Sequence, residues 1–137
     1  MALNIREEIP PAEQFWPLFQ STGWNREYRL SPAEVMQGLR NSWYAVAAYE
    51  GAVLVGFGRL VSDEVLYAMI YDLIVLPDHQ RQGIGTRILD LLLQRCRRAK
   101  IRDIQLFCAR GKRSFYEKRG FVARPDDAPG MQYRPES

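Results

Sequence analysis

The sequence predicts a single α/β domain, spanning residues 1–137, in which helices cover a mixed β-sheet. Three observations support this class. Strand-like segments alternate with segments of helical periodicity along the chain. After residue 66, a strand, a long helix and a second strand follow one another, which predicts a parallel β-α-β unit. The 137 residues, 47% of them hydrophobic and 26% charged, suffice for one core.

The first half of the chain predicts a strand, two helices and a β-hairpin, in that order. The expected bounds are residues 3–8 for the strand, 11–20 and 31–41 for the helices, and 43–49 and 52–60 for the hairpin strands. The second helix has a clear start: Ser31 can cap it, Pro32 suits its first position, and Glu34 can complete a capping box. Trp24 and Tyr28 lie in the expected loop between the helices. They either cover the core edge or line a ligand pocket.

The second half predicts the centre of the sheet and the elements that complete it. The expected bounds are 66–76 for a central strand, 84–99 for a long helix, 101–108 for a parallel strand, 111–119 for a short helix, and 121–123 and 131–134 for two closing strands. Gly120 is expected to end the short helix in the left-handed conformation. Asp72 interrupts the apolar central strand on the face of Ile70 and Ile74, so its carboxylate should be paired or hydrogen-bonded.

Composition argues against several classes of protein. The formal net charge of +3 is too small to indicate nucleic-acid binding, and the basic cluster around residues 95–102 is expected to be a solvated helix face. No apolar run approaches the ~18 residues of a membrane span, and no signal core is visible, so a soluble, cytoplasmic protein without a membrane partner is expected. Cys96 and Cys108 lack metal-ligand spacing and are expected to be reduced core residues, with no metal site.

A glycine-bearing turn joins the central strand to the long helix, with the pattern Gln80-x-x-Gly83-x-Gly85. The first amides of a helix have no intrahelical partners, and the positive end of the helix dipole lies beside them. The turn therefore predicts an anion site that suits a pyrophosphate. Neither the dinucleotide fingerprint nor the nucleotide P-loop pattern is present.

This turn and the downstream segment Phe115-Tyr116-Glu117-Lys118-Arg119-Gly120-Phe121 together resemble the GNAT superfamily of acetyl-CoA-dependent N-acetyltransferases. The resemblance extends from about residue 43 to residue 134. It implies a twisted mixed sheet of about seven strands with four helices, whose central parallel strands splay apart to admit acetyl-CoA as cosubstrate. It assigns pantetheine pairing to the backbone of Leu73, Ile74 and Val75, and pyrophosphate binding to the turn residues Arg81, Gln82, Gly83, Ile84, Gly85 and Thr86.

The resemblance also implies an acyltransferase that moves the acetyl group directly to the primary amine of a small molecule. Tyr116 matches a family tyrosine that can protonate the departing thiolate from about 3 Å. Its alternative role is packing beside Phe115 and Phe121. Several members carry a glutamate where this chain has Met69, so the base is not evident. Asp72 aligns with a frequent acidic residue and is the candidate base, although that residue can be structural.

Acceptor pockets in this family lie opposite the coenzyme, and the expected lining residues here are Trp24, Tyr28, Arg59 and Tyr71. Tyr71 is expected to face away from Asp72. Arg59 would favour an anionic acceptor, whereas the aspartates of residues 126–131 would favour a cationic amine. Two alternatives remain, a glucosamine-6-phosphate-type N-acetyltransferase and a non-catalytic CoA-binding regulatory module. The family often forms homodimers, which nothing in this sequence decides.

Overall fold

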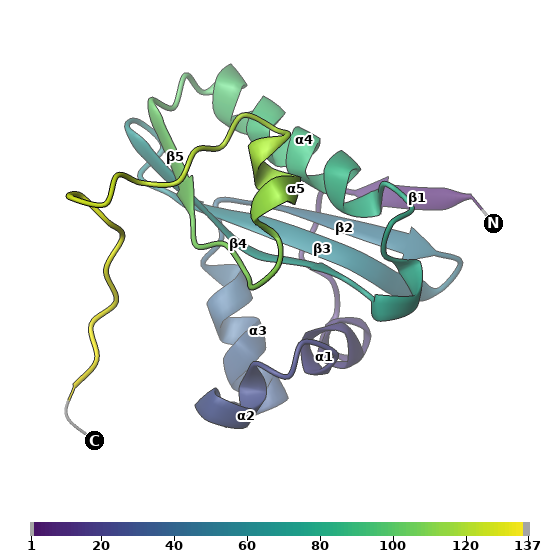
Figure 1. The fold of residues 1–137 in the computed structure, drawn as a ribbon. Helices are drawn as coiled ribbons and strands as arrows, with labels where there is room; N and C mark the ends of the chain where they lie inside the picture. The colour runs from purple at the N-terminus through teal and green to yellow at the C-terminus, as the bar shows by residue number, and fades with distance from the viewer. Residues whose placement is uncertain (1, 136–137) are drawn as a thin grey trace. The chain divides into compact units, whose positions relative to one another are not determined.

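The computed structural model describes residues 2–135, which divide into a larger unit up to Gln105 and a smaller unit from Leu106 onward. A mixed sheet has five strands in chain order (Figure 1), and all of it except Leu106, the last residue of the fifth strand, lies in the larger unit. The strands are β1 (Leu3–Arg6), β2 (Tyr44–Glu50), β3 (Val53–Ser62), β4 (Tyr67–Val75) and β5 (Asp103–Leu106). The helices are α1 (Ala12–Gln20), α2 (Asn25–Tyr28), α3 (Pro32–Arg40), α4 (Ile84–Arg98) and α5 (Arg113–Glu117), with a 3₁₀ turn η1 (Pro77–His79). The predicted mixed α/β fold is confirmed.

Strands β1 to β4 form an antiparallel meander whose two faces are covered by different helices (Figure 1). Helices α1 and α3 cover one face, where Phe15 of α1 meets Phe57 of β3 edge-on, with ring centroids 5.0 Å apart. Helix α4 covers the other face and buries Ile88 and Leu92 completely. Because both faces are covered, residues 54–58 and Leu60 of β3 are buried, as expected of a central strand.

Several local predictions are confirmed. The capping box at the start of α3 is complete: the Glu34 amide donates to Ser31 Oγ at 3.2 Å, and the Ser31 amide donates to Glu34 Oε1 at 2.9 Å. Helix α4 begins and ends within a residue of the expected bounds. Gly120 follows the short helix with a φ of 92°, the left-handed conformation that glycine adopts without strain.

The loop predicted over residues 22–28 is partly helical. Asn25 holds it closed, because its side chain accepts from the Leu30 amide at 2.8 Å and donates to the Leu30 carbonyl at 2.9 Å. Both backbone groups of Leu30 are thereby satisfied, and the preceding turn becomes the short helix α2. Cys96 and Cys108 are free thiols, but Cys108 is exposed, so the prediction that it is a core residue is wrong.

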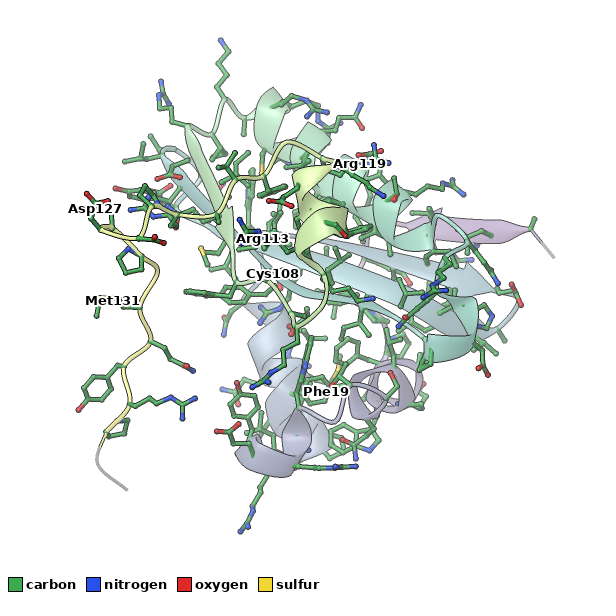
Figure 2. All side chains as sticks on the ribbon, in the orientation of Figure 1. Phe19, Cys108, Arg113, Arg119, Asp127 and Met131 are labelled. Atoms are coloured by element: carbon green, nitrogen blue, oxygen red, sulfur yellow. The ribbon has the colours of Figure 1, made fainter. Side chains whose placement is uncertain are left out.

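The two closing strands predicted at 121–123 and 131–134 are not strands in the part of the chain that the structure describes, which has five strands where about seven were expected. Met131 and Tyr133 are 84% and 87% exposed, and Figure 2 shows Met131 on the extended segment that follows α5. A strand needs a paired neighbour for its backbone, and alternation of residue type alone does not supply one.

Two further expectations concern the chain as a whole. Within residues 2–135, no helix is both long enough and apolar enough to cross a membrane. The single domain spanning residues 1–137 and the cytoplasmic location stay predictions.

Candidate functional site

The turn between β4 and α4 presents backbone amides without helical partners. Arg81 and Gly83 both adopt left-handed conformations, with φ values of 65° and 82°. The first hydrogen bond of α4 runs from the Arg87 amide to the Gly83 carbonyl at 3.1 Å. The amides of Ile84 and Gly85 precede that bond, so they are available to an anion. A Cβ placed on Gly83 would meet no protein atom within 4 Å, which shows that the space beside the turn is open.

Two side chains tie this turn to the sheet. Gln80 Nε2 donates to the Val75 carbonyl at 3.1 Å, which joins the turn to the end of β4. His79 Nε2 lies 3.4 Å from Glu50 Oε1 at the end of β2, and the two side chains are 22% and 36% exposed. These contacts limit the positions that the loop before α4 can take.

Strand β4 contains a β-bulge next to the predicted site. Between the cross-strand pairs Phe57–Ile74 and Arg59–Tyr71, one residue of β3 opposes two residues of β4. Asp72 is one of those two, with a left-handed φ of 55°. Aspartate tolerates this conformation better than most residues other than glycine. An extra residue in one strand bends that strand and re-aims the side chains beside it.

The bulge brings Tyr71 and Asp72 to the same face of the sheet. Arg59 Nε donates to Asp72 Oδ2 at 2.7 Å, and the guanidinium carbon lies 5.5 Å from the centroid of the Tyr71 ring. Ile70 opposes Leu60, the neighbour of Arg59, and so lies on the other face. The predictions that Asp72 shares a face with Ile70 and that Tyr71 faces away from Asp72 are therefore wrong. The predicted need of the carboxylate for a partner is confirmed.

Arg59 also reaches the end of α3. Its Nη1 donates to Ser42 Oγ at 3.2 Å and to the Gly38 carbonyl at 3.4 Å. The side chains of Arg59 and Asp72 are only 17% and 20% exposed. We call Ser42, Arg59, Tyr71 and Asp72 the Arg59 cluster. Ser42 is not among the predicted site residues, because its distance along the chain from Arg59 matches no helical or strand spacing.

The other two predicted acceptor residues have different surroundings. The Trp24 ring lies edge-on to Phe19 of α1, with centroids 6.5 Å apart, and is 38% exposed. Tyr28 is at the end of α2 and is 61% exposed. Trp24 thus covers the edge of the core, which was one of its two predicted roles. Ligand binding by Trp24 and Tyr28 stays a prediction.

Strands β4 and β5 are joined at their beginnings. The amides of Arg102 and Asp103 donate to the Leu66 carbonyl at 3.1 and 2.9 Å. Helix α4 connects the two strands, so they run in the same direction. Strand β5 has four residues and ends well before the end of β4, which has nine. The last part of β4 consequently extends beyond its neighbour.

The peptide groups in that part of β4 alternate in direction. The Leu76 amide donates to the Val55 carbonyl at 2.9 Å, so Leu76 pairs with β3. In an antiparallel ladder every second residue bonds to the same neighbour, so Ile74 also pairs with β3, whereas Val75 points away from it. The Leu73 carbonyl belongs to the same trans peptide as the Ile74 amide and so also points away. The outward Val75 carbonyl accepts the bond from Gln80. The Leu73 and Val75 backbones therefore form an edge beyond the end of β5.

Tyr116 belongs to the smaller unit, and its surroundings there are aromatic. Its ring lies edge-on to Phe115 and Phe121, with centroid distances of 5.1 and 5.8 Å. Burial raises the pKa of Tyr116 to about 12, and the nearby Cys108 side chain adds a smaller increase. The phenol is therefore protonated at neutral pH. The predicted packing is confirmed, and the role as an acid stays a prediction.

A glycine turn with free amides, placed between a sheet and a long helix, is the kind of site that suits an anionic ligand. The acetyltransferase (GNAT) family model matches residues 8–121, and this chain belongs to that family. The family membership and the fold expected from the resemblance are confirmed.

Relatives with curated names are acetyltransferases. The chain is 34% identical over 122 residues to the uncharacterized N-acetyltransferase ycf52 of Pyropia yezoensis, covering 86% of this chain and 68% of that one. It is 28% identical over 129 residues to histone acetyltransferase TAP1 of Glycine max, covering 86% and 54%. The match spans 47% to 68% of the lengths of four ycf52 and ycf52-like relatives.

Solved structures agree with the fold. The GNAT family protein SP0256 of Streptococcus pneumoniae is 28% identical with a TM-score of 0.84, and the match covers 99% of this chain and 100% of that one. Glucosamine-6-phosphate N-acetyltransferase of Arabidopsis thaliana has a TM-score of 0.72 at 14% identity, with 99% of each chain covered. Identity that low shows a shared fold alone.

Proposed function

We propose that this protein transfers the acetyl group of acetyl-CoA to the primary amine of a small molecule. The observation that carries the proposal is the turn at Gly83, where free amides at the start of α4 adjoin open space at the end of β4. The amides of Arg81, Gln82, Gly83, Ile84, Gly85 and Thr86 would bind the pyrophosphate of the coenzyme.

The edge of β4 beyond the end of β5 would bind the pantetheine arm. Val75 directs its amide and carbonyl away from β3, and Leu73 directs its carbonyl away, so they can pair with the pantetheine amides as a neighbouring strand would. Ile74 lies between them and pairs with β3. Of the three residues predicted to pair with pantetheine, only Leu73 and Val75 are therefore proposed to do so. An arm that starts at the Gly83 turn and follows this edge runs toward Asp72. The thioester would then lie near the Arg59 cluster.

The proposed reaction is a direct attack. The neutral amine forms a bond to the thioester carbonyl carbon, the carbon–sulfur bond breaks, and the sulfur leaves as a thiolate. Tyr116 would donate its phenolic proton to that thiolate, and burial keeps the phenol protonated at neutral pH until the step. The proton that the amine loses goes to Asp72 Oδ1 or to water, because Asp72 Oδ2 already accepts from Arg59.

The charges of the Arg59 cluster favour an acceptor without a phosphate. Arg59 would be the cation for an anionic acceptor, but its Nε bonds to Asp72 at 2.7 Å and its Nη1 bonds to Ser42. The positive charge is therefore balanced within the protein. This supports an uncharged or cationic amine over glucosamine 6-phosphate.

Calorimetry and a thiol-release assay test the proposal. Acetyl-CoA is titrated first, and the assay then compares a polyamine, an aryl-alkylamine, an amino sugar, glucosamine 6-phosphate and a lysine-containing peptide. We expect coenzyme binding and release of CoA with one of the first three amines. Tyr116→Phe should lower kcat about 100-fold or more without changing acetyl-CoA affinity, whereas the control Tyr133→Phe should change neither.

Each other outcome identifies a different error. Binding without turnover on any amine, unchanged in Tyr116→Phe, would leave a non-catalytic CoA-binding module. Turnover only with the phosphosugar or only with the peptide would contradict the proposed acceptor class. No binding of acetyl-CoA would mean that the Gly83 turn is wrongly assigned.

A further inference from the structure

We propose that Arg59 and Asp72 are positioning residues, which hold the bulge of β4 in the shape that presents Leu73 and Val75 to acetyl-CoA. This inference rests on the proposed function, since it concerns the edge to which the coenzyme would bind. It assigns the two side chains a role in coenzyme affinity and takes Asp72 out of the proton-transfer step.

The bulge is a conformation that needs support from outside the strand. Asp72 has a φ of 55°, in the region that most side chains avoid. On that side of β4, residues 2–135 supply only the four-residue strand β5, which ends before this part of β4. The backbone between Tyr71 and Ile74 is therefore set by β3 and by side-chain contacts.

Arg59 supplies such contacts from two directions. Its Nε donates to Asp72 Oδ2 at 2.7 Å, while its Nη1 donates to Ser42 Oγ at 3.2 Å and to the Gly38 carbonyl at 3.4 Å. The guanidinium group is planar, so fixing Nη1 at the end of α3 also fixes the direction in which Nε points. Arg59 thus links the bulge residue of β4 to a rigid helix end.

The surroundings of this pair strengthen the link. Arg59 and Asp72 are 17% and 20% exposed, so water competes less for their hydrogen bond than it does at an open surface. The guanidinium carbon also lies 5.5 Å from the centroid of the Tyr71 ring, on the residue just before the bulge. A carboxylate held in this way serves as an acceptor for Arg59. The proton of the amine then goes to water.

A set of four variants separates positioning from proton transfer. Arg59→Met removes the donor, and Asp72→Gly removes the carboxylate but allows the left-handed φ without any side-chain support. The double variant has neither side chain and keeps the permissive glycine. The matched control is Arg40→Met, which removes an exposed arginine near the end of the same helix α3. The dissociation constant for acetyl-CoA, kcat and the melting temperature are measured for each.

We expect Arg59→Met to raise the acetyl-CoA dissociation constant about tenfold, the loss that follows from breaking one charge-assisted hydrogen bond. The change in kcat of the same variant should be much smaller than tenfold. In the double variant, the glycine at position 72 should restore most of the acetyl-CoA affinity that Arg59→Met loses. A general loss of stability would not be reversed in this way. Arg40→Met should match the wild type. Should Arg59→Met melt too low to assay, Arg59→Lys tests the same link with the charge retained.

Two results would overturn the inference. If Asp72→Gly lowers kcat 100-fold or more at unchanged acetyl-CoA affinity, Asp72 is the base and not a positioning residue. If Arg59→Met binds acetyl-CoA as the wild type does, or the double variant shows no recovery, the pair does not hold the bulge. If the wild-type protein fails to bind acetyl-CoA, the proposed function itself is contradicted. Failure of the proposed function and failure of the positioning role are therefore distinguishable.

Discussion

Gly58 of β3 lies directly against Ile88 of α4. A Cβ placed on Gly58 would be 2.8 Å from Ile88 Cγ2 and 3.0 Å from Leu92 Cδ1, closer than side-chain atoms approach one another. Ile88 and Leu92 are both fully buried, so neither has space to move. The two residues thus set how closely α4, whose N-terminus follows the Gly83 turn, packs on the sheet.

Gly58→Ala should therefore destabilise the protein by about 1–3 kcal/mol, as overpacking of a core does. Urea unfolding followed by circular dichroism gives the free energy of unfolding. The matched control is Gly38→Ala in α3, where a Cβ would meet no atom within 4 Å. That variant should be more stable than the wild type by about 0.4–1 kcal/mol. Equal effects of the two substitutions would contradict the close packing of α4.

Gly83→Val should abolish acetyl-CoA binding in calorimetry while leaving the protein folded. The valine side chain would occupy the open space beside the turn, where the pyrophosphate is proposed to lie. The control Gly23→Val puts the same side chain at a similar φ of 76° in another loop with open space around it. Gly23→Val therefore has a similar cost in backbone strain, and it should keep its affinity for acetyl-CoA. Retained affinity in Gly83→Val would show that the turn does not bind the phosphates.

The protein should become less stable at alkaline pH, where the Tyr49 hydroxyl tends to lose its proton. Tyr49 is 7% exposed, and its hydroxyl donates to Glu8 Oε2 at 2.7 Å. Burial raises the pKa of Tyr49 above its usual value, and Glu8 raises it further. The unfolded chain then loses this proton at a lower pH than the folded protein does. The stabilisation is complete below about pH 10 and is lost as the pH rises through the folded pKa, by up to about 1.4 kcal/mol per pH unit.

Urea unfolding between pH 8 and pH 11 measures this loss. Tyr49→Phe should be about 1 kcal/mol less stable at pH 8, because the hydrogen bond is gone, and should lose less stability above pH 10. The exposed Tyr28→Phe is the control and should follow the wild type throughout. A Tyr49→Phe curve that parallels the wild type at high pH would contradict the prediction.

The pH dependence of kcat tests Tyr116 separately. An acid works in its protonated form, and burial raises the pKa of Tyr116 to about 12, so the phenol keeps its proton well above neutral pH. With the best amine of the panel, kcat should show no falling limb between pH 7 and pH 10. Tyr116→Phe should have a profile of the same shape at a lower level. A fall in the wild-type rate with an apparent pKa below 10 would assign the acid to another group.

Local features were predictable from the sequence because each depends on residues that are close together in the chain. The capping box needs only Ser31 and Glu34, three residues apart. The turn at Gly83 combines a strand end, glycines and a helix start within a few residues, so its free amides follow from helix geometry. The family could be inferred because this turn and the segment around Tyr116 are both short motifs.

The direction of the side chains on β4 depended on another strand. Simple alternation placed Tyr71 and Asp72 on opposite faces, but one extra residue opposite β3 turns both toward Arg59. The strands expected at residues 121–123 and 131–134 failed for a related reason, since a strand exists only when a neighbour pairs with its backbone.

The sequence by itself thus determined the mixed α/β class, the bounds of α1, α3 and α4 to within a residue, and the glycine turn before α4, because local spacing and helix geometry are sufficient for these. The tertiary structure alone decided that Asp72 bonds to Arg59 and that Arg59 also bonds to Ser42. Those contacts join residues that are distant along the chain, and they form only after β3, β4 and α3 have packed together.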